Sequence, residues 1–316
     1  MIGDYLDFEE PIAALERKII DLQSSESVDK EGLSKEIKRL NDSIIKLTQK
    51  VYLNLTPWEC VQVARHPQRP HFYDYIEGAF DGFVELHGDR QFGDDRALIG
   101  GLASIEEYSF ILIGHEKGRT TEEKIKHNFG MPQPEGYRKA ARLMYLAERF
   151  SIPVVTLVDT PGAYPGIDSE ERGQSEAIAK NLSLMSTLKT PILVYVVGEG
   201  GSGGALAIAV GDHISMMQYS TYSVASPEAC ASIVWRDSKK APEAAEAMQM
   251  DARSILKLDL IDEILEEPLG GAHRNSSSTF ATLRKSIVSN LGKLKTFSLP
   301  TLVERRYKRL ISYGSI

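Results

Sequence analysis

The sequence predicts an α/β fold, in which a parallel β-sheet is preceded and followed by helices. Two apolar runs, beginning at Pro153 and Pro191, each end in a glycine-rich turn, and a helical segment separates them. Continuous apolar strands are typical of a sheet that is buried on both faces, and helices between strands indicate parallel pairing. Apolar residues at heptad spacing over residues 11–55 predict, in addition, a helical hairpin ahead of the sheet.

The remaining elements are predicted in order along the chain. A connector rich in proline and aromatic residues follows the hairpin at 65–76. The core then alternates strands and helices: strands at 96–105 and 108–118, a helix at 136–150, a strand at 153–159, a helix at 170–187, a strand at 191–197, a short helix at 205–210 and further short elements up to 235. A loop near residue 272 leads to two helical segments. We therefore expect three parts: a helical hairpin (1–55), a core (56–272) and a C-terminal helical extension (273–316).

Net charge, cysteine content and hydropathy exclude several classes of protein. A net charge of −7 argues against nucleic acid as a partner. Two cysteines, Cys60 and Cys230, form neither a disulfide framework nor a four-cysteine zinc site, and the histidines lack metal-binding spacing, so we expect no metal. The N-terminus lacks the pattern of a signal peptide, and no apolar run has membrane-spanning length, which predicts a cytoplasmic protein without a membrane partner.

The most unusual stretch is GEGGSGG, residues 198–204, which places five glycines in seven positions directly after a strand. A dinucleotide loop, G-x-G-x-x-G, fits the letters, but only six residues separate Gly204 from Gly211, too few for a crossover helix. A hydrolase elbow, G-x-S-x-G, would make Ser202 a nucleophile, but the downstream histidines, His213 and His273, are poorly placed for a triad. Both hypotheses are disfavoured.

A third hypothesis uses the main chain of this stretch. Glycine carries no Cβ, so a substrate carbonyl can approach the backbone, and amides at a helix N-terminus carry partial positive charge. The amides of Gly203 and Gly204 would then form an oxyanion hole, to which the DTPGAYPG turn (159–166) on the neighbouring strand would add a wall or a donor. The competing interpretation is that the glycines serve only the tight packing of strand and helix.

Longer motifs support the third hypothesis. From LDFEEPIA near the start to RRYKRLISYG at the end, the chain resembles the alpha chain of the carboxyltransferase component of bacterial-type acetyl-CoA carboxylase. The motifs that carry the resemblance are ARHPQRP, GHEKGR, NFGMPQPEGYRKA, DTPGAYPG with ERGQSEAIA, GEGGSGGALAI, YSTYSVASPEACASI and PLGGAHRN. The resemblance implies a crotonase-type fold, a spiral of ββα units, which agrees with the two repeated strand–turn units.

The resemblance also implies a reaction and partners. Biotin on a biotin carboxyl carrier protein, charged by a biotin carboxylase, would donate its carboxyl group to acetyl-CoA and give malonyl-CoA, the first committed step of fatty acid biosynthesis. This chain would supply the biotin side of the active site. A beta subunit with a zinc ribbon would supply most of the acetyl-CoA side, in an α2β2 assembly that is active only when both subunits are present.

The site residues implied by the resemblance lie in the two glycine-rich segments. The amides of Gly203 and Gly204 would stabilise the negative charge that develops on the ureido oxygen of biotin. The carboxybiotin cleft would be lined by Gly162, Ala163, Tyr164, Gly200, Gly201 and Ser202. The freed biotin nitrogen would take the proton from the acetyl methyl group, so that no protein base is required.

Charged residues outside these segments give further candidates. Basic residues that would meet a carboxylate or CoA phosphates stand around one polar loop and the helix after it: Lys117, Arg119, Lys124, Lys126, Arg138, Lys139 and Arg142. A surface or inter-subunit face is expected for the basic cluster near the end: Arg305, Arg306, Lys308 and Arg309. A self-sufficient acyl-CoA hydratase or isomerase on the same fold would instead need an acid such as Glu199 or Glu228, and a non-catalytic scaffold would rely on the hairpin helices.

Overall fold

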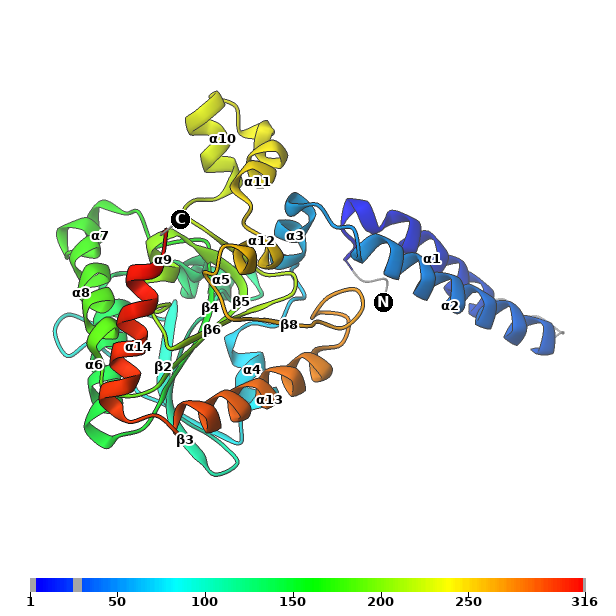
Figure 1. The fold of residues 1–316 in the computed structure, drawn as a ribbon. Coiled ribbons are helices and arrows are strands. Elements are labelled where there is room, and N and C mark those ends of the chain that lie inside the picture. The colour runs from blue at the N-terminus through cyan, green and yellow to red at the C-terminus, as the bar shows by residue number, and fades with distance from the viewer. Residues whose placement is uncertain (1–3, 25–29, 315–316) are drawn as a thin grey trace.

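The computed structural model describes residues 4–24 and 30–314, and a β-sheet forms its centre (Figure 1). The strands lie in the order β1-β2-β3-β4-β5-β6-β8, and β7 pairs with the end of β5. Their bounds are β1 Gly82–Glu85, β2 Leu98–Ile105, β3 Tyr108–His115, β4 Val154–Thr160, β5 Ile192–Gly201, β6 His213–Met217, β7 Thr221–Ser223 and β8 Glu263–Leu265. From β3 to β8 the pairing is parallel, as predicted, whereas β1, β2 and β3 pair antiparallel.

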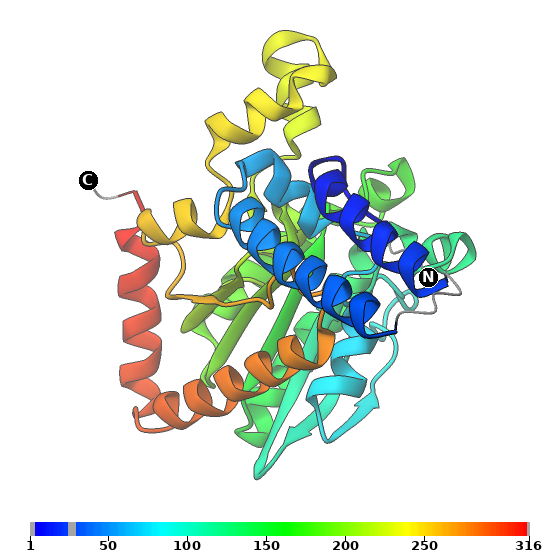
Figure 2. The ribbon, with the colours of Figure 1, turned by 90° about the vertical axis from the view of Figure 1, so that its right-hand side faces the viewer.

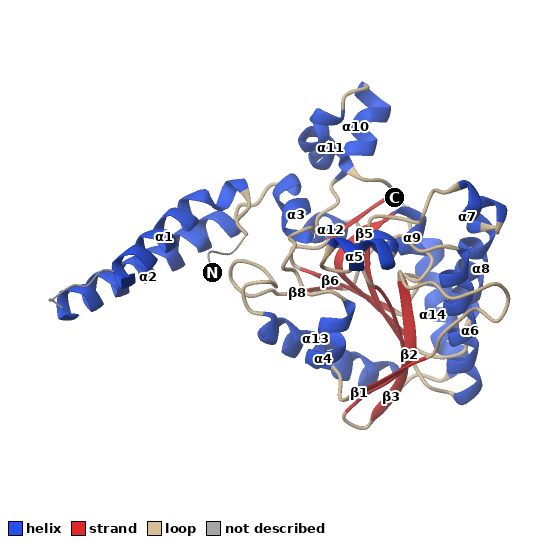
Figure 3. Cartoon of the chain, turned by 180° about the vertical axis from the view of Figure 1, so that it is seen from behind, coloured by secondary structure: helices blue, strands red, loops and turns tan. Residues whose placement is uncertain are grey.

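Helices cover both faces of the sheet (Figure 3). One face packs against α6 and α8, and the other packs against α4 and α13. The bounds of the helices are α1 Glu10–Ser24, α2 Lys30–Tyr52, α3 Pro57–Ala64, α4 Phe72–Ala79, α5 Thr121–Lys126, α6 Pro134–Phe150, α7 Ile167–Glu171, α8 Gln174–Thr187, α9 Ser202–Leu206, α10 Pro227–Trp235, α11 Ala241–Met248, α12 Ala252–Lys257, α13 Ser276–Leu294 and α14 Leu299–Ser312.

Side-chain alternation along the central strands explains why both faces are apolar. In β5, Ile192, Val194 and Val196 face α6 and α8, whereas Leu193 and Tyr195 face α4 and α13. Successive residues of a strand point to opposite faces, so a continuous apolar run fills two cores at once. The strand is therefore fixed in place from both sides, and its carboxyl end is held rigidly where it leaves the core.

The predicted helical hairpin forms an arm that extends away from this body (Figure 1), and Figure 2 looks along the arm toward the sheet. Helices α1 and α2 pack against each other, with Ile12, Ile19 and Leu40 buried. At the base of the arm, a buried hydrogen bond of 2.8 Å from the Tyr52 hydroxyl to the carboxylate of Glu9 joins the end of α2 to the segment before α1. The heptad stripe is thus used mainly between the two helices of the arm.

Several helices begin where the sequence carries a capping residue. Thr56 and Glu59 form a reciprocal capping box at α3, and Ser298 caps α14 by accepting from the amide of Thr301. Within the described residues, none of the helices combines the length and apolarity that crossing a membrane requires.

The basic C-terminal helix corrects one expectation. Arg306 does not lie on a surface, because its guanidinium is buried and bonds Asp212 at 2.7 Å and the carbonyl oxygens of Met185 and Leu188, both at 2.7 Å. Arg309 also forms an ion pair, with Asp262. The cluster therefore fastens α14 to the body, and Arg305 and Lys308 remain on its outer side.

Candidate active site

The two glycine-rich segments meet at the carboxyl ends of β4 and β5. Thr160 at the end of β4 is in register with Gly200 of β5. A Cβ on Gly201 would overlap the carbonyl oxygen of Pro161, so glycine at this position allows the two backbones to touch. The stretch expected to be a loop is therefore mostly strand: β5 continues through Gly201, and α9 begins at once.

The predicted catalytic pair lies in the first turn of α9. A Cβ on Gly204 would overlap the backbone of Gly162 and Ala163, which places the predicted cleft residues directly against it. A Cβ on Gly203 would make only ordinary contact, 3.6 Å from Ile178. Gly204 is buried and Gly203 is half-buried. Packing therefore demands glycine at 204, whereas at 203 it leaves room for a side chain.

The turn from β5 into α9 is sharp. Ser202 has φ of +51°, in the left-handed region that a residue with a Cβ rarely adopts. The helix expected at 205–210 therefore starts earlier, at Ser202. The first amides of a helix have no acceptor within it, so those of Gly203 and Gly204 are free of intrahelical bonds. Strain of this kind at a strand end is common at functional sites.

Tyr164 faces a different neighbour from the other predicted cleft residues. Its amide donates to the carbonyl of Pro132 at 3.0 Å, and its ring lies over Gly166, where a Cβ would overlap it. Gln174 of α8 donates to the carbonyl oxygens of both Tyr164 and Pro132, each at 2.9 Å. The DTPGAYPG turn is thus held from behind by the segment that precedes α6.

An apolar pocket of about 630 Å³ opens beside Gly203 of the predicted catalytic pair. Ser202 and Gly203 form part of its wall, and Gly162, Ala163 and Tyr164 are not among its lining residues. Most of the remaining wall is aliphatic: Leu182, Leu206, Val210, Ile214, Val224, Leu258, Leu260 and Leu310. Val224 at its rim is 82% exposed, so apolar surface continues outward from the pocket.

A network of charged side chains lies next to the glycine segments, and little in the sequence indicates it. Lys117 bonds Asp159 at 2.6 Å and Glu199 at 2.8 Å, and Arg65 bonds Glu199 at 2.6 Å and Glu228 at 2.5 Å. Burial alone would raise the pKa of Glu199, but Lys117 and Arg65 outweigh it and lower that pKa to about 2. The two carboxylates named for a hydratase are therefore held ionised in ion pairs, which suits neither to act as a general acid near neutral pH.

One buried histidine lies beneath the site. His115 at the end of β3 accepts a hydrogen bond of 3.3 Å from the amide of Asp159 at its Nδ1. Burial, with help from the charge of Lys117, lowers the pKa of His115 to about 3. The ring is therefore neutral, and it serves packing between strand ends.

The histidines considered for a hydrolase triad are held elsewhere. His213 lies 3.3 Å from Glu263, and His273 stacks on His66 with a distance of 3.8 Å between ring centroids. Among the residues that the structure describes, no histidine is hydrogen-bonded to the hydroxyl of Ser202. The geometry thus gives no support to Ser202 as an activated nucleophile.

Most of the basic residues considered for a carboxylate or CoA phosphates are already paired. Besides Lys117, Arg119 pairs with Asp74, and Arg138 pairs with Asp89 and Glu135. Lys139 pairs with Asp94 at 2.6 Å, and Arg142 donates to main-chain carbonyl oxygens of residues 86–88. These side chains stabilise the fold around the site, and their charge is largely neutralised.

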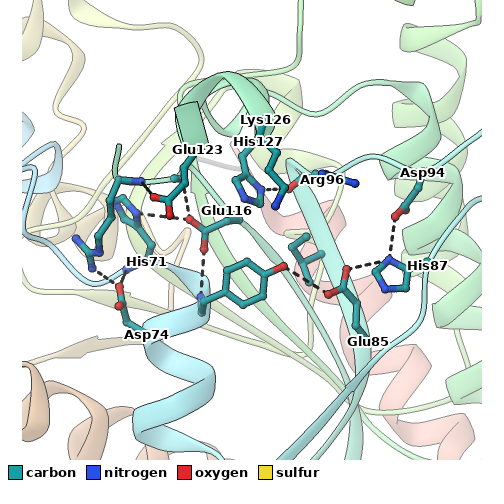
Figure 4. A pocket seen from close by; sticks show the side chains of 14 residues that line it. His71, Asp74, Glu85, His87, Asp94, Arg96, Glu116, Glu123, Lys126 and His127 are labelled. Carbon is teal, nitrogen blue, oxygen red and sulfur yellow. Dashed lines mark hydrogen bonds and ion pairs between the residues drawn. The ribbon is translucent and has the colours of Figure 1, made fainter. Parts of the chain in front are cut away.

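A second pocket, of about 550 Å³, lies at the β1 side of the same sheet edge and is polar (Figure 4). Figure 4 shows Glu85, His87 and Asp94 turned toward one another. Their ligand atoms all lie within 4.8 Å, a spacing at which such groups can hold a metal ion. Here they bond each other instead: His87 Nδ1 lies 2.9 Å from Asp94 and 3.2 Å from Glu85. Arg119 and Lys126, which the sequence suggested for a carboxylate or CoA phosphates, line this pocket, whereas none of the residues predicted in the glycine segments does.

Comparison with known proteins links this geometry to one group of enzymes. Residues 5–314 match the family model described as "Acetyl co-enzyme A carboxylase carboxyltransferase-like". Proteins named acetyl-coenzyme A carboxylase carboxyl transferase subunit alpha are 56% identical over 312 residues in Teredinibacter turnerae and 57% identical over 315 residues in Histophilus somni. The matches cover 99% of this chain in both cases, and 98% and 99% of those relatives.

Solved structures share the fold at low sequence identity. The transcarboxylase 12S hexamer core matches with a TM-score of 0.59 at 19% identity, covering 72% of this chain and 42% of that one. The beta subunit of P. aeruginosa geranyl-CoA carboxylase matches with a TM-score of 0.54 at 19% identity, covering 72% of this chain and 44% of that one. This chain therefore spans less than half of each solved chain, and the likeness confirms the crotonase-type α/β fold.

Proposed function

This chain belongs to the family of acetyl-CoA carboxylase carboxyltransferase alpha subunits, and from that premise we propose that it forms the carboxybiotin side of a split active site. The family's activity is carboxyl transfer within acetyl-CoA carboxylase, and an alpha subunit works with a beta subunit. Its acyl-CoA product, malonyl-CoA, is the substrate for fatty acid synthesis. The contribution of this chain's own residues depends on the geometry at α9.

The main-chain amides of Gly203 and Gly204 are the proposed catalytic groups. When the carboxyl group leaves the nitrogen of carboxybiotin, negative charge develops on the ureido oxygen. Two N–H groups at the start of α9 meet such an oxygen with the positive end of the helix, and donors of this kind lower a barrier by about 3 kcal/mol each. The single observation that carries the proposal is the packing of Gly204 on Gly162 and Ala163, which sets these amides at the strand ends.

The apolar pocket beside Gly203 suits the rest of the biotinyl group. Its wall is aliphatic, and a bicyclic ring on an alkyl arm is a largely apolar ligand. Gly203 and Ser202 border the pocket, so a ring in it presents its polar edge to the start of α9. The residues present therefore fit the group, and they bind and orient it without any charged contact.

Exposed apolar residues around the pocket support a subunit contact there. Val224 and Leu258 line the pocket and are 82% and 54% exposed, and Ile233 and Trp235 are further exposed apolar residues on α10. Exposed apolar residues that gather beside a pocket often mark an interface. We assign the surface to the beta subunit, which would complete the pocket and supply the second oxyanion hole, for the thioester enolate of acetyl-CoA. An α2β2 assembly, a biotin carboxyl carrier protein and a biotin carboxylase complete the proposed system.

The alternative functions are weaker on this geometry. A hydratase or isomerase needs a free carboxylic acid in the cleft, whereas Glu199 and Glu228 both bond Arg65. A scaffold role would use the helical arm. It does not explain the left-handed backbone conformation of Ser202 or the close backbone contact at Gly204.

Reverse carboxyl transfer tests the proposal. Malonyl-CoA and biocytin are incubated with the chain alone, with the beta subunit alone and with both, and acetyl-CoA is measured. We expect activity only in the mixture, and loss of that activity in G203V, whose side chain closes the approach to the amides. Activity in the chain alone would contradict the split site. Full activity of the G203V complex would contradict the oxyanion hole and favour the scaffold.

A further inference from the structure

Two motifs of the sequence, ARHPQRP (64–70) and GHEKGR (114–119), have no role in the proposed function. Each of them places a cation against the same short stretch of β5, residues 197–199: the buried Arg69 and the half-buried Lys117. These motifs come from different elements, the α3–α4 connector and the end of β3. Their convergence on a stretch next to the glycine segment indicates that this stretch must be held in a particular shape.

The stretch is a β-bulge. Val158 of β4 pairs with Val196 of β5, but two residues later Thr160 pairs with Gly200, so that β5 has three residues where β4 has one. Before the bulge β5 pairs with β6, and after it β5 pairs with β7. A bulge bends its strand and changes the direction of the chain beyond it. In this protein the chain beyond the bulge leads directly into the first turn of α9.

Asp159 fills the bulge from the opposite strand. Its Oδ1 accepts a hydrogen bond of 2.9 Å from the amide of Glu199, and its carboxylate occupies the space that a Cβ on Gly198 would need. Lys117 Nζ lies 2.6 Å from the same Oδ1 and 2.8 Å from Oε2 of Glu199. The ammonium of Lys117 therefore bridges two carboxylates at adjacent strand ends, and Arg65, 2.6 Å from Glu199, supplies the second positive charge.

Arg69 closes the other side of the bulge. Its Nε donates to the carbonyl oxygen of Val197 at 2.8 Å, which satisfies a main-chain acceptor at the bulge. Its two terminal nitrogens bond both oxygens of Glu267, at 2.9 Å and 2.7 Å, and the pair is almost completely buried. The guanidinium of Arg69 thus contacts the bulge on one side, and the ammonium of Lys117 contacts it on the other.

We infer that Lys117 is a positioning residue for carboxyl transfer: by bridging Asp159 and Glu199 it holds the β5 bulge in the shape that aims the amides of α9. The inference rests on the proposed function, and it deepens it by naming the side chain on which the main-chain site depends. Lys117 itself touches no substrate. Without its charge, Arg65 would still hold Glu199, but Asp159 would be a buried carboxylate with no bonded cation, and its repulsion of Glu199 would open the bulge.

The first test compares two buried lysines in the alpha–beta complex, with malonyl-CoA and biocytin as substrates. In K117M we expect kcat to fall about 100-fold, as small displacements of catalytic groups do. KM for malonyl-CoA should change little, because the partner binds the acyl-CoA. The matched control is K139M, which removes a lysine that is 1% exposed and bonded to Asp94. It should lower the melting temperature and leave kcat of the folded complex unchanged.

A second variant separates charge from packing. In K117M/D159N, asparagine keeps the volume and the acceptor for the amide of Glu199 but removes one of the two facing charges. We expect it to recover kcat by roughly tenfold over K117M, about 1.4 kcal/mol of barrier. If K117M does not fold, the double variant is compared with D159N, and near-equal kcat supports the inference.

The outcomes are distinguishable. Three results would overturn the positioning role: wild-type kcat in K117M, a loss of kcat no larger than that in K139M, or no recovery of kcat in K117M/D159N. In each of these cases, transfer by the wild-type complex would still support the proposed function. Absence of transfer in the wild-type complex overturns the proposed function, and this inference with it. A loss in K117M that D159N relieves, with KM preserved, supports both.

Discussion

The two pockets along the carboxyl edge of the sheet differ in how they present polar groups. At the β1 side, the pocket in Figure 4 is crowded with charged side chains, and these pair with one another, as His87 does with Asp94 and Arg119 with Asp74. At the β5 side, the pocket is mainly apolar and is lined by no charged side chain, and its polar groups are the hydroxyls of serine and tyrosine and the main chain around Ser202 and Gly203. The pocket at the β1 side is thus the richer in titratable side chains, but the charges of these side chains are largely neutralised by one another.

The difference shows which polar groups of a folded chain can still bind a ligand. A paired side chain has already gained its electrostatic stabilisation and has little left for a ligand. The first amides of a helix have no partner in the helix, so a ligand that accepts from them gains the full interaction. We therefore place the reaction where side chains are absent, and we expect changes at α9 to affect transfer far more than changes on the polar side.

The largest effect is expected from G204A. The new Cβ would overlap the backbone of Gly162 and Ala163 and push the start of α9 away from the β4 turn. We expect kcat for reverse transfer in the alpha–beta complex to fall by about 100-fold or more, the cost of losing an oxyanion donor.

The control for G204A is G101A. Gly101 lies in β2, and its Cβ would also overlap backbone, at Val84 and Glu85 of β1, so the steric conflict is similar but far from α9. G101A should lower the melting temperature and leave kcat of the surviving complex near the wild-type value. Equal losses of kcat in both variants would show that G204A acts through folding alone.

The two sides should also respond to pH with opposite sign. Burial raises the pKa of Asp95, on the β1 side, to about 6 from 3.8, so the folded state binds more protons there and stability should fall as pH rises from about 4 to 6. The pKa of Glu199 is lowered to about 2, chiefly by Lys117 and Arg65 acting against burial, so its contribution is present above about pH 4.5 and is lost as pH falls toward 2. The Asp95 effect amounts to roughly 2–3 kcal/mol.

Urea unfolding of the chain at a series of pH values measures both slopes. D95N should remove the loss of stability between pH 4 and 6, and E199Q should leave that window unchanged while flattening the slope below pH 4.5. A loss of stability between pH 4 and 6 that is as large in D95N as in the wild type would contradict the assignment to Asp95.

The sequence predicted the elements whose signals are local. The heptad spacing of the arm, the buried strands β4 and β5 and the helix between them all follow from short-range periodicity. The sequence also singled out the glycine pair, because five glycines after a strand exceed what a tight turn needs, and its catalytic role stays a prediction. Its close neighbours Gly162 and Ala163 could be anticipated, since parallel strand ends meet at one edge of a sheet.

Other features depend on contacts between residues far apart in the chain, which no local pattern reveals. The pairing of Arg69 with Glu267 joins residues nearly 200 positions apart, and the burial of Arg306 depends on Asp212. A basic helix looks like a surface whether or not one arginine reaches inward. The bulge in β5 was missed for the same reason, because it exists only relative to the register of β4. The ARHPQRP and GHEKGR motifs were the available signals, because both supply cations to this stretch.

A smaller effect is expected from G203A. Its Cβ would lie 3.6 Å from Ile178, an ordinary contact, so the fold should tolerate it. The methyl group narrows the approach to the amides without displacing α9, and we expect kcat to fall by roughly tenfold with the melting temperature unchanged. Steady-state kinetics and thermal unfolding of the same preparation check this. A G203A complex as inactive as G204A would mean that position 203 also requires glycine for packing.

The smallest effect is expected from metal ions at the β1 side. Glu85, His87 and Asp94 have the residue types of a metal site, but the ammonium of Lys139 lies 2.6 Å from Asp94 and would repel a dication. Hydrogen bonding to Lys139 and to the amide of Gly88, acting against burial, lowers the pKa of Asp94 to about 2. This carboxylate already has hydrogen-bond donors that a metal ion would have to displace. We expect titration of the alpha chain with Zn²⁺ to give no stoichiometric binding, and H87A to leave the calorimetric trace and the transfer activity unchanged. One equivalent of zinc bound by the wild type and lost in H87A would show that paired side chains on the polar side retain binding capacity, and the contrast between the two pockets would fail.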